Sequence, residues 1–233
     1  WANADTWPLP ETEWQRFYLH SRGHANSAAG DGLINRDEPG TEPPDNYIYN
    51  PLDPVPTRGG RINPDLNQAA GPQDQTIVEK RNDVLCYKTP ELKDDLEVTG
   101  PLTLHLFAAT SAVDTDFFVK MVDHYPNGLA INVAEGCIRA RYRRSILEPR
   151  PVVPGEVNEY VIDLASTSNV FLKGHRIGID IMSSNFPRFE RNMNTGHAFG
   201  VDATGVTAMQ TVFHQPEYPS YIDLPVIPGK TQG

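Results

Sequence analysis

The feature that most constrains the fold is a long series of short segments in which apolar and polar residues alternate. In residues 102–108, every second residue is a leucine or an alanine, and these residues fall on one face. A period of two is typical of a β-strand with one buried face, whereas a helix repeats about every 3.6 residues. Such segments follow one another from Val84 to the end of the chain, and no long amphipathic helix interrupts them.

Turn sequences rich in Gly, Pro and Asn separate these segments, as at Pro126-Asn127-Gly128 and Lys173-Gly174. Many short strands at regular spacing are typical of sandwiches and barrels. We therefore predict an all-β, jelly-roll-like sandwich with roughly eleven strands. The strand candidates are residues 14–19, 47–49, 96–99, 102–108, 116–122, 129–133, 137–142, 157–164, 176–182, 207–214 and 221–227.

The first 85 residues differ from the rest, because Gly, Pro, Asn and Asp are dense there and strand patterns are few. Residues 50–56 predict an extended stretch, since proline restricts its own φ angle and the conformation of the residue before it. Residues 59–75 lack periodicity, which is typical of a functional or mobile loop. We predict one domain, in which residues 1–85 are a loop-rich N-terminal segment packed on the sandwich and residues 86–233 supply the main jelly-roll strands.

The net charge of −10, from 20 basic and 30 acidic residues, argues against nucleic acid or an anionic membrane as partner. Both of those partners favour clustered Lys and Arg. No apolar run approaches the roughly 18 residues that a membrane span needs. The chain begins Trp1-Ala2-Asn3, without Met or the features of a signal peptide, so we expect its true N-terminus to lie upstream. The sequence does not determine the cellular compartment of the protein, and we slightly favour the cytoplasm.

The sequence contains no motif of self-contained catalysis. A G-x-S-x-G nucleophile elbow, a Walker loop, an H-E-x-x-H pair and a G-x-G-x-x-G after a strand are all missing. Ser27, His24 and Asp31 can be assembled into a triad on paper, but nothing around them supplies an oxyanion hole or a strained nucleophile turn. We therefore predict no catalytic residue, no metal and no cofactor in this chain, and structural roles for its seven histidines.

Two further features have structural interpretations. Cys86 and Cys137 both lie in apolar strand-like segments, which favours two buried free thiols over a disulfide. Asp114 and Asp116 form a short carboxylate pair of a kind that can bind Ca²⁺, but such pairs more often cap backbone N–H groups in turns.

The densest polar segment, residues 183–196, follows an apolar strand and reads Ser-Ser-Asn-Phe-Pro-Arg-Phe-Glu-Arg-Asn-Met-Asn-Thr-Gly. Asn side chains in loops usually satisfy backbone groups, whereas Arg, Phe and Met are enriched at interfaces. The segment is therefore either an internal brace or a contact with another domain.

Several stretches occur in an order that resembles one family. They are Val-Thr-Gly-Pro-Leu at 98–102, Thr-Ser-Ala-Val-Asp-Thr-Asp-Phe at 110–117, Val-Asp-His-Tyr-Pro-Asn-Gly at 122–128, Glu-Gly-Cys-Ile-Arg-Ala-Arg-Tyr-Arg at 135–143, and the segment 183–196. Together they resemble the C-terminal domain of the Xaa-Pro dipeptidyl-peptidase and cocaine-esterase-like (CocE/NonD) serine hydrolases. The resemblance covers nearly the whole chain.

The resemblance implies a larger protein with an N-terminal α/β-hydrolase domain, a helical cap and this galactose-binding-like jelly roll. The Ser-His-Asp triad of the family lies in the α/β domain, which is absent here, so no catalytic residue can be transferred to this chain. The implied function is that of a non-catalytic domain of an acyl esterase or Xaa-Pro dipeptidyl-peptidase, which walls the substrate pocket and stabilises the catalytic domain. The implied partner is that α/β-hydrolase domain, in the same chain or as a separate subunit; a homodimer is a further option.

The resemblance also implies site residues. Residues 59–75 correspond to a stretch that reaches the pocket in cocaine-esterase-like members and carries bulky apolar residues there; the more polar stretch here implies a more polar substrate. The candidate pocket or interdomain residues are Ile62, Asn63, Leu66, Phe186, Arg188, Phe189, Arg191 and Asn194. A missing partner domain would leave an exposed apolar patch. For that patch we predict Trp1, Trp7, Phe186, Phe189 and Met193.

A carbohydrate-binding module is the alternative, because a jelly-roll fold does not by itself determine function. Such a module would need exposed aromatic platforms. Trp1, Trp7 and Trp14 cluster at the N-terminus, where burial against another domain explains them equally well.

Overall fold

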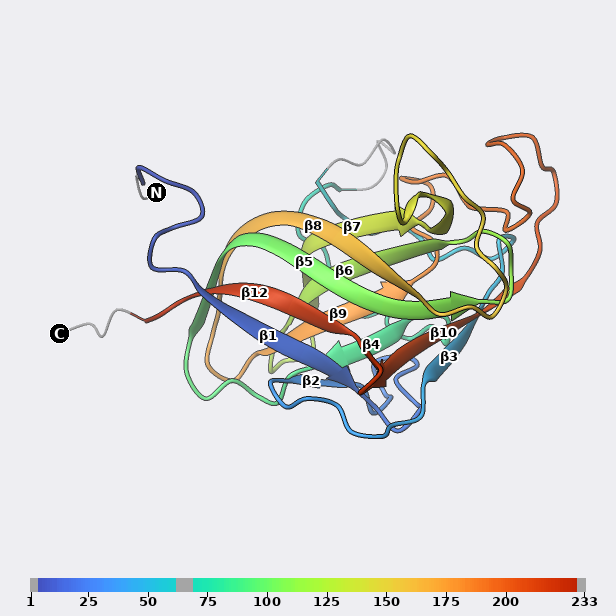
Figure 1. The fold of residues 1–233 in the computed structure, drawn as a ribbon. Helices are drawn as coiled ribbons and strands as arrows, with labels where there is room; N and C mark the ends of the chain where they lie inside the picture. The colour runs from blue at the N-terminus through green and yellow to red at the C-terminus, as the bar shows by residue number, and fades with distance from the viewer. Residues whose placement is uncertain (1–3, 62–68, 230–233) are drawn as a thin grey trace.

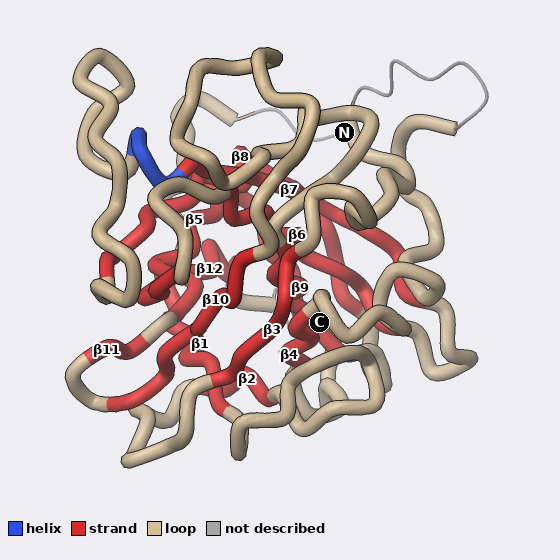
Figure 2. Tube along the Cα trace, turned by 90° about the vertical axis from the view of Figure 1, so that its right-hand side faces the viewer, coloured by secondary structure: helices blue, strands red, loops and turns tan. Residues whose placement is uncertain are grey.

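The computed structural model describes residues 4–61 and 69–229, and this part of the chain is almost entirely β-structure (Figure 1). Its twelve strands are hydrogen-bonded into one sheet, which folds back on itself so that two layers face each other across a shared apolar core. The one helix in the described residues is a single 3₁₀ turn, Ala140–Tyr142, blue in Figure 2. The predicted all-β sandwich is confirmed.

The first layer is built around β5 (Leu96–Thr110), the longest strand. β8 (Asn158–Phe171) pairs antiparallel with β5 along almost its whole length. On the other edge of β5, β12 (Tyr221–Ile227) pairs with the first half and β10 (Ala208–Gln215) pairs with the second half. One strand therefore organises three neighbours.

Three further strands extend this layer. β1 (Glu13–His20) pairs antiparallel with β12, so the first and last strands of the chain lie side by side. β3 (Asp45–Tyr49) and β11 (Tyr218–Pro219) both pair antiparallel with β10.

The second layer consists of four antiparallel strands in the order β4 (Leu85–Lys88), β9 (Arg176–Met182), β6 (Asp116–His124) and β7 (Ala130–Arg139). β2 (Leu33–Asn35) joins the two layers, because it pairs antiparallel with β1 and parallel with β4.

Side chains from both layers fill the core. The alternating leucines of β5, Leu102, Leu104 and Leu106, have no exposed surface, as their period of two predicts. Strand β6 differs, because both of its faces are buried: Phe117 contacts the main core, while Phe118 contacts a second cluster on the outer face of the layer.

Part of the N-terminal segment forms that second cluster with the sheet. Its buried members are Val55, Val78, Val84, Cys86, Phe118 and Met182. The outer face of the second layer is thus covered by the part of the chain that precedes β4. This covering buries strand side chains that would otherwise be exposed to solvent.

The structure corrects the prediction that Gly100-Pro101 separates two strands, because both residues lie inside β5. The ladder with β8 shifts its register between Pro101 and Thr103, and such a bulge accommodates proline within a sheet. Gly100 has φ +152°, and a Cβ atom there would lie 2.6 Å from Pro225 Cβ of β12. Glycine is required here by this close approach of two strands rather than by a turn.

The predicted strand over residues 137–142 is also wrong beyond Arg139, where the chain turns into the 3₁₀ helix. Cys137 is exposed on β7, whereas Cys86 is buried, and neither forms a disulfide. The prediction of two buried thiols therefore holds for Cys86 only. In the described residues, no helix is both long and apolar enough to cross a membrane.

Candidate functional site

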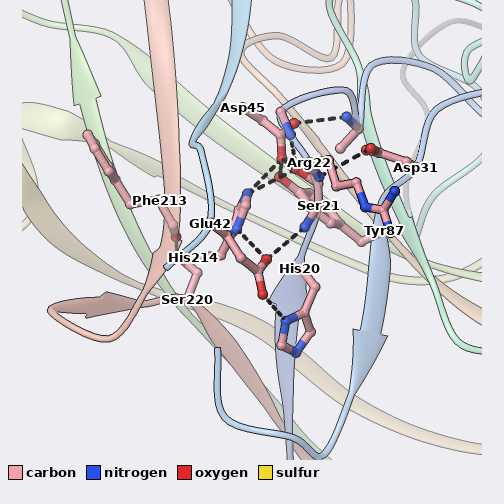
Figure 3. Close-up of polar contacts among 12 residues, drawn as sticks. His20, Ser21, Arg22, Asp31, Glu42, Asp45, Tyr87, Phe213, His214 and Ser220 are labelled. Atoms are coloured by element: carbon pink, nitrogen blue, oxygen red, sulfur yellow. Dashed lines mark hydrogen bonds and ion pairs between the residues drawn. The ribbon is translucent and has the colours of Figure 1, made fainter. Parts of the chain in front are cut away.

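A group of polar and ionisable side chains surrounds the buried His214, where β10 meets the start of β3 and the end of β1 (Figure 3). His214 Nε2 lies 3.0 Å from Asp45 Oδ2, and its Nδ1 lies 3.1 Å from Glu42 Oε2. Ser21 Oγ and the Tyr87 hydroxyl each donate to Asp45 Oδ2 at 2.7 Å. The cluster therefore joins three strands, β3, β4 and β10, with two loop residues, Ser21 directly after β1 and Glu42 before β3.

The charges in this cluster are mutually stabilised. Burial opposes ionisation of His214, but its hydrogen bond to Asp45 and the charges of Asp45 and Glu42 raise its pKa above the ordinary value. Burial likewise opposes ionisation of Asp45, but hydrogen bonds from His214, the Ala25 N–H, Ser21 and Tyr87 lower its pKa. His214 thus lies between two carboxylates, and the shifts of both pKa values favour the charged forms of His214 and Asp45.

Ser21, His214 and Glu42 resemble a catalytic triad in their distances, since Ser21 Oγ lies 3.1 Å from His214 Nε2. The proton positions argue against that chemistry. A general base must accept the serine proton at Nε2, but this nitrogen also lies 3.0 Å from Asp45 Oδ2, and an ionised carboxylate can only accept in that contact. Ser21 is only 6% exposed and donates its proton to Asp45. The cluster is structural.

Sequence reasoning did not find this cluster. The triad considered from the sequence used His24, Ser27 and Asp31, and none of these residues contacts His214 through a hydrogen bond in the described part of the chain. The members lie at positions 21, 42, 45, 87 and 214, so no local motif signals their contact.

The predicted segment 183–196 makes most of its polar contacts within the chain. The backbone of Phe186 exchanges hydrogen bonds with Val55 and Thr57, at 3.0 and 2.7 Å. The Arg191 guanidinium lies 4.9 Å from the Phe186 ring centroid and donates to Pro51 O at 3.1 Å. These contacts attach the segment to the N-terminal part of the chain.

The remaining predicted residues of the segment contact the second layer of the sheet and the loop that precedes β10. Arg188 forms an ion pair with Glu135 of β7, and the Phe189 ring packs edge-on against Phe118 of β6 at 5.1 Å between centroids. Asn194 adopts φ +62° and donates to Val206 O at 2.6 Å. Ile62, Asn63 and Leu66 lie outside the described residues.

The Asp114 and Asp116 carboxylates are occupied by side chains of the chain itself. Arg141 Nε donates to Asp114 Oδ2 at 2.7 Å, and Arg139 donates to both oxygens of Asp116 at 2.6 and 2.8 Å. Asn192 bridges the two carboxylates through hydrogen bonds of 2.9 Å. This pattern is the internal bracing expected of a structural pair, and no group of three or more His, Cys, Asp or Glu side chains within 4–61 and 69–229 is arranged to hold a metal ion.

The exposed apolar surface lies partly elsewhere than predicted. Trp7 is exposed, but Phe186, Phe189 and Met193 are half-buried, because Phe186 and Phe189 pack on other side chains. The most exposed large apolar side chains are Leu147 at 86% and Ile146 at 81%, in the loop after the 3₁₀ turn. Phe199 and Val201 are also exposed, in a loop that is attached to the 3₁₀ turn by the hydrogen bond of 3.1 Å from Arg141 Nη2 to His197 O.

The fold is all-β, and the His214 cluster has no serine placed to act as a nucleophile. Comparison with known proteins identifies the class of protein to which such a chain belongs. Residues 1–223 match the family of X-Pro dipeptidyl-peptidase C-terminal non-catalytic domains. The chain belongs to this family. The match favours an accessory domain of a hydrolase and gives no support to a carbohydrate-binding module.

Individual relatives agree with this assignment. The chain is 45% identical over 231 residues to cocaine esterase from Rhodococcus sp. (strain MB1 Bresler), a match that covers 97% of this chain and 40% of that protein. An aminopeptidase structure from a marine sediment archaeon, Thaumarchaeota archaeon, superimposes with a TM-score of 0.85 at 30% identity, over 98% of this chain and 38% of that one. An α-amino acid ester hydrolase has a TM-score of 0.80 at 30% identity, over 91% and 36%. The chain thus spans about two fifths of the length of these relatives.

Proposed function

We propose that this chain is the C-terminal accessory domain of an α/β serine hydrolase that cleaves acyl esters or peptides, and that it contributes a wall of the substrate pocket and stabilises the catalytic domain. Two observations carry the proposal. The chain matches a family of non-catalytic C-terminal domains, and it corresponds to two fifths or less of the length of its relatives. Two of the relatives are named as ester hydrolases and one as an aminopeptidase. Cleavage of an ester or amide bond is the chemistry common to these names, and a further relative, from Mycobacterium bovis, is named as a putative serine esterase, which favours acyl transfer to a serine in a domain outside this chain.

The accessory role predicts that the purified 233-residue chain does not hydrolyse p-nitrophenyl acetate. The reason is that Ser21 donates its hydrogen bond to Asp45, and that Nε2 of His214, whose pKa is raised by Asp45 and Glu42, also faces the Asp45 carboxylate. The measurement is the release of p-nitrophenolate by wild type and by the Ser21→Ala variant. Turnover above the buffer rate that disappears in Ser21→Ala would refute the structural reading of the His214 cluster, and turnover that persists in the variant would place catalysis elsewhere in this chain.

We also propose that the two loops with Ile146, Leu147, Phe199 and Val201 contact the catalytic domain. All four apolar side chains are exposed, and exposed apolar patches are typical of interaction surfaces. Replacing Ile146 and Leu147 together with Ser is expected to change the unfolding free energy of the isolated chain by less than about 0.5 kcal/mol, since both side chains are already exposed. In the complete hydrolase the same pair of substitutions is expected to lower the melting temperature.

The control for that experiment is Val161→Ser, an exposed apolar residue that lies within strand β8 and not in either loop. It is expected to leave the melting temperature of the complete hydrolase unchanged. Equal effects of the loop and strand substitutions would contradict the proposed contact.

A further inference from the structure

A small cavity of about 170 Å³ lies between β6, β7 and the segment that follows β9. Its walls include two aromatic rings, Phe118 and Phe189, which meet edge to face. Its charged residues are Arg61, Lys120, Arg188 and Glu135. The cavity thus combines an apolar wall with three cationic residues and one carboxylate.

Glu135 cannot neutralise all three cations. Its Oε1 pairs with the Arg188 guanidinium and accepts the Arg61 backbone N–H, and its Oε2 accepts from Asn185 at 3.2 Å. The Arg61 guanidinium donates to the neutral Leu164 carbonyl at 3.1 Å. The Lys120 ammonium donates to the neutral side-chain oxygen of Gln75 at 2.9 Å.

Within residues 4–61 and 69–229, neither Arg61 nor Lys120 forms an ion pair with a carboxylate closer than 4 Å. The mutual repulsion of these groups is reflected in their proton affinities. Burial and then the charge of Arg61 lower the pKa of Arg188. Burial lowers the pKa of Lys120 to about 8; Asp180 opposes this shift, and Arg188 adds to it. Asp180 lies opposite Lys120 in the pairing of β6 with β9 and compensates part of its charge, so Arg61 and Arg188 are left to share Glu135, and one added anion would balance these two guanidinium groups.

We propose that this cavity binds the carboxylate group of a small organic acid, held by the guanidinium groups of Arg61 and Arg188 with its apolar part against Phe118 and Phe189. Planar guanidinium groups match the two oxygens of a carboxylate. A singly charged anion fits better than a phosphate dianion, because Glu135 lies in the same wall. The site consists of residues of this chain alone and does not depend on the proposed hydrolase function.

The test is a titration of the 233-residue chain with phenylacetate, followed through the Nε–H signals of its arginines by NMR. Phenylacetamide, a neutral analogue of the same shape, and inorganic phosphate are the comparison ligands. Phenylacetate is expected to shift the signals of Arg61 and Arg188 saturably. Phenylacetamide is expected to bind at least about tenfold more weakly, since charge-assisted hydrogen bonds are roughly twice as strong as neutral ones, and phosphate is expected to do the same because its second charge is repelled by Glu135.

Three variants sharpen the test. Arg61→Gln removes an exposed cation and is expected to weaken phenylacetate binding about tenfold. Glu135→Gln removes the competing negative charge and is expected to strengthen it several-fold, provided that thermal melting shows the variant folded. Arg22→Gln, an exposed arginine outside the cavity, is the matched control and is expected to bind like wild type.

A fourth variant, Asp65→Asn, distinguishes a free acid from a side chain of the protein itself as the source of the carboxylate. Asp65 is the first carboxylate that follows Arg61 in the sequence. If phenylacetate binds only after Asp65→Asn, the carboxylate that belongs in the cavity is the chain's own, and the proposal of a free acid is overturned. Absence of saturable binding in wild type and in Asp65→Asn, or equal binding of phenylacetate and phenylacetamide, also overturns it.

Discussion

Replacing Asp45 with Asn is expected to lower the free energy of unfolding by about 3–5 kcal/mol, the range typical of breaking a buried charge pair. The side chain has no exposed surface, and it accepts hydrogen bonds from Ser21, Tyr87 and the backbone of Ala25, besides its contact with His214. An amide has one acceptor oxygen in place of two and would leave the His214 charge partly uncompensated. Urea denaturation of the isolated chain, followed by circular dichroism, measures the loss.

The matched control is Asp223→Asn, which breaks an ion pair on the surface. Asp223 accepts from Arg16 Nε at 3.0 Å, with both side chains partly exposed. Such pairs contribute about 0–1 kcal/mol, so this variant is expected to unfold near the wild-type midpoint. Similar losses for Asp45→Asn and Asp223→Asn would show that the buried cluster does not stabilise the fold more than a surface pair.

The same cluster determines a dependence of stability on pH. The pKa of His214 is raised by folding, so its contribution is complete below the ordinary pKa of His, about 6.5, and is lost as the pH rises through the folded value. The pKa of Asp45 is lowered by folding, so its contribution is complete above about 3.9 and is lost as the pH falls through its folded value. The cluster is therefore most stabilising between about pH 4 and 6.5, and Asp45→Asn is expected to flatten the profile at both ends of this range.

Replacing Gly136 with Ala is expected to destabilise the domain by about 2–3 kcal/mol, because backbone would have to move to admit the methyl group. Gly136 lies on β7, and a Cβ atom there would sit 2.2 Å from the Asp163 carbonyl oxygen of β8. The second layer approaches the first at this point, so the substitution would separate their edges. Thermal melting of the variant beside wild type measures the effect.

Gly40 is the control for that substitution, because a Cβ atom there meets no atom within 4 Å and its φ angle is not in the left-handed region. Gly40→Ala is expected to match wild type or to exceed it slightly, since alanine restricts the unfolded chain. If Gly136→Ala and Gly40→Ala have the same melting temperature, the close approach of β7 and β8 does not limit side-chain size at position 136.

How far the sequence predicts this molecule depends on which residues carry the signal. The alternating leucines of β5 predict their strand and its buried face, because hydrophobic periodicity is a local property. The continuation of β5 through Gly100-Pro101 could not be predicted in this way, since it depends on the register shift of the ladder with β8 and on the close passage of Pro225, both on strands far away in the sequence. Local turn chemistry was overridden by a tertiary contact.

The candidate sites show the same division. The segment 183–196 was identified from its composition, and the structure shows what each described side chain contacts there. The His214 cluster was missed, because its members come from five separate positions and only the sheet topology joins them. The contact of the candidate residues with a catalytic domain stays a prediction.

The pairing of β1 with β12 has a consequence for how the domain folds. Its contacts join residues such as Glu13 and Val226, which are separated by almost the whole chain. Loop closure over such distances is slow, and β-folds dominated by non-local pairs fold on millisecond to second timescales or longer. During synthesis, the edge of β1 has no partner until the last strand has left the ribosome, so the sheet is completed late and β1 stays open to incorrect pairing until then.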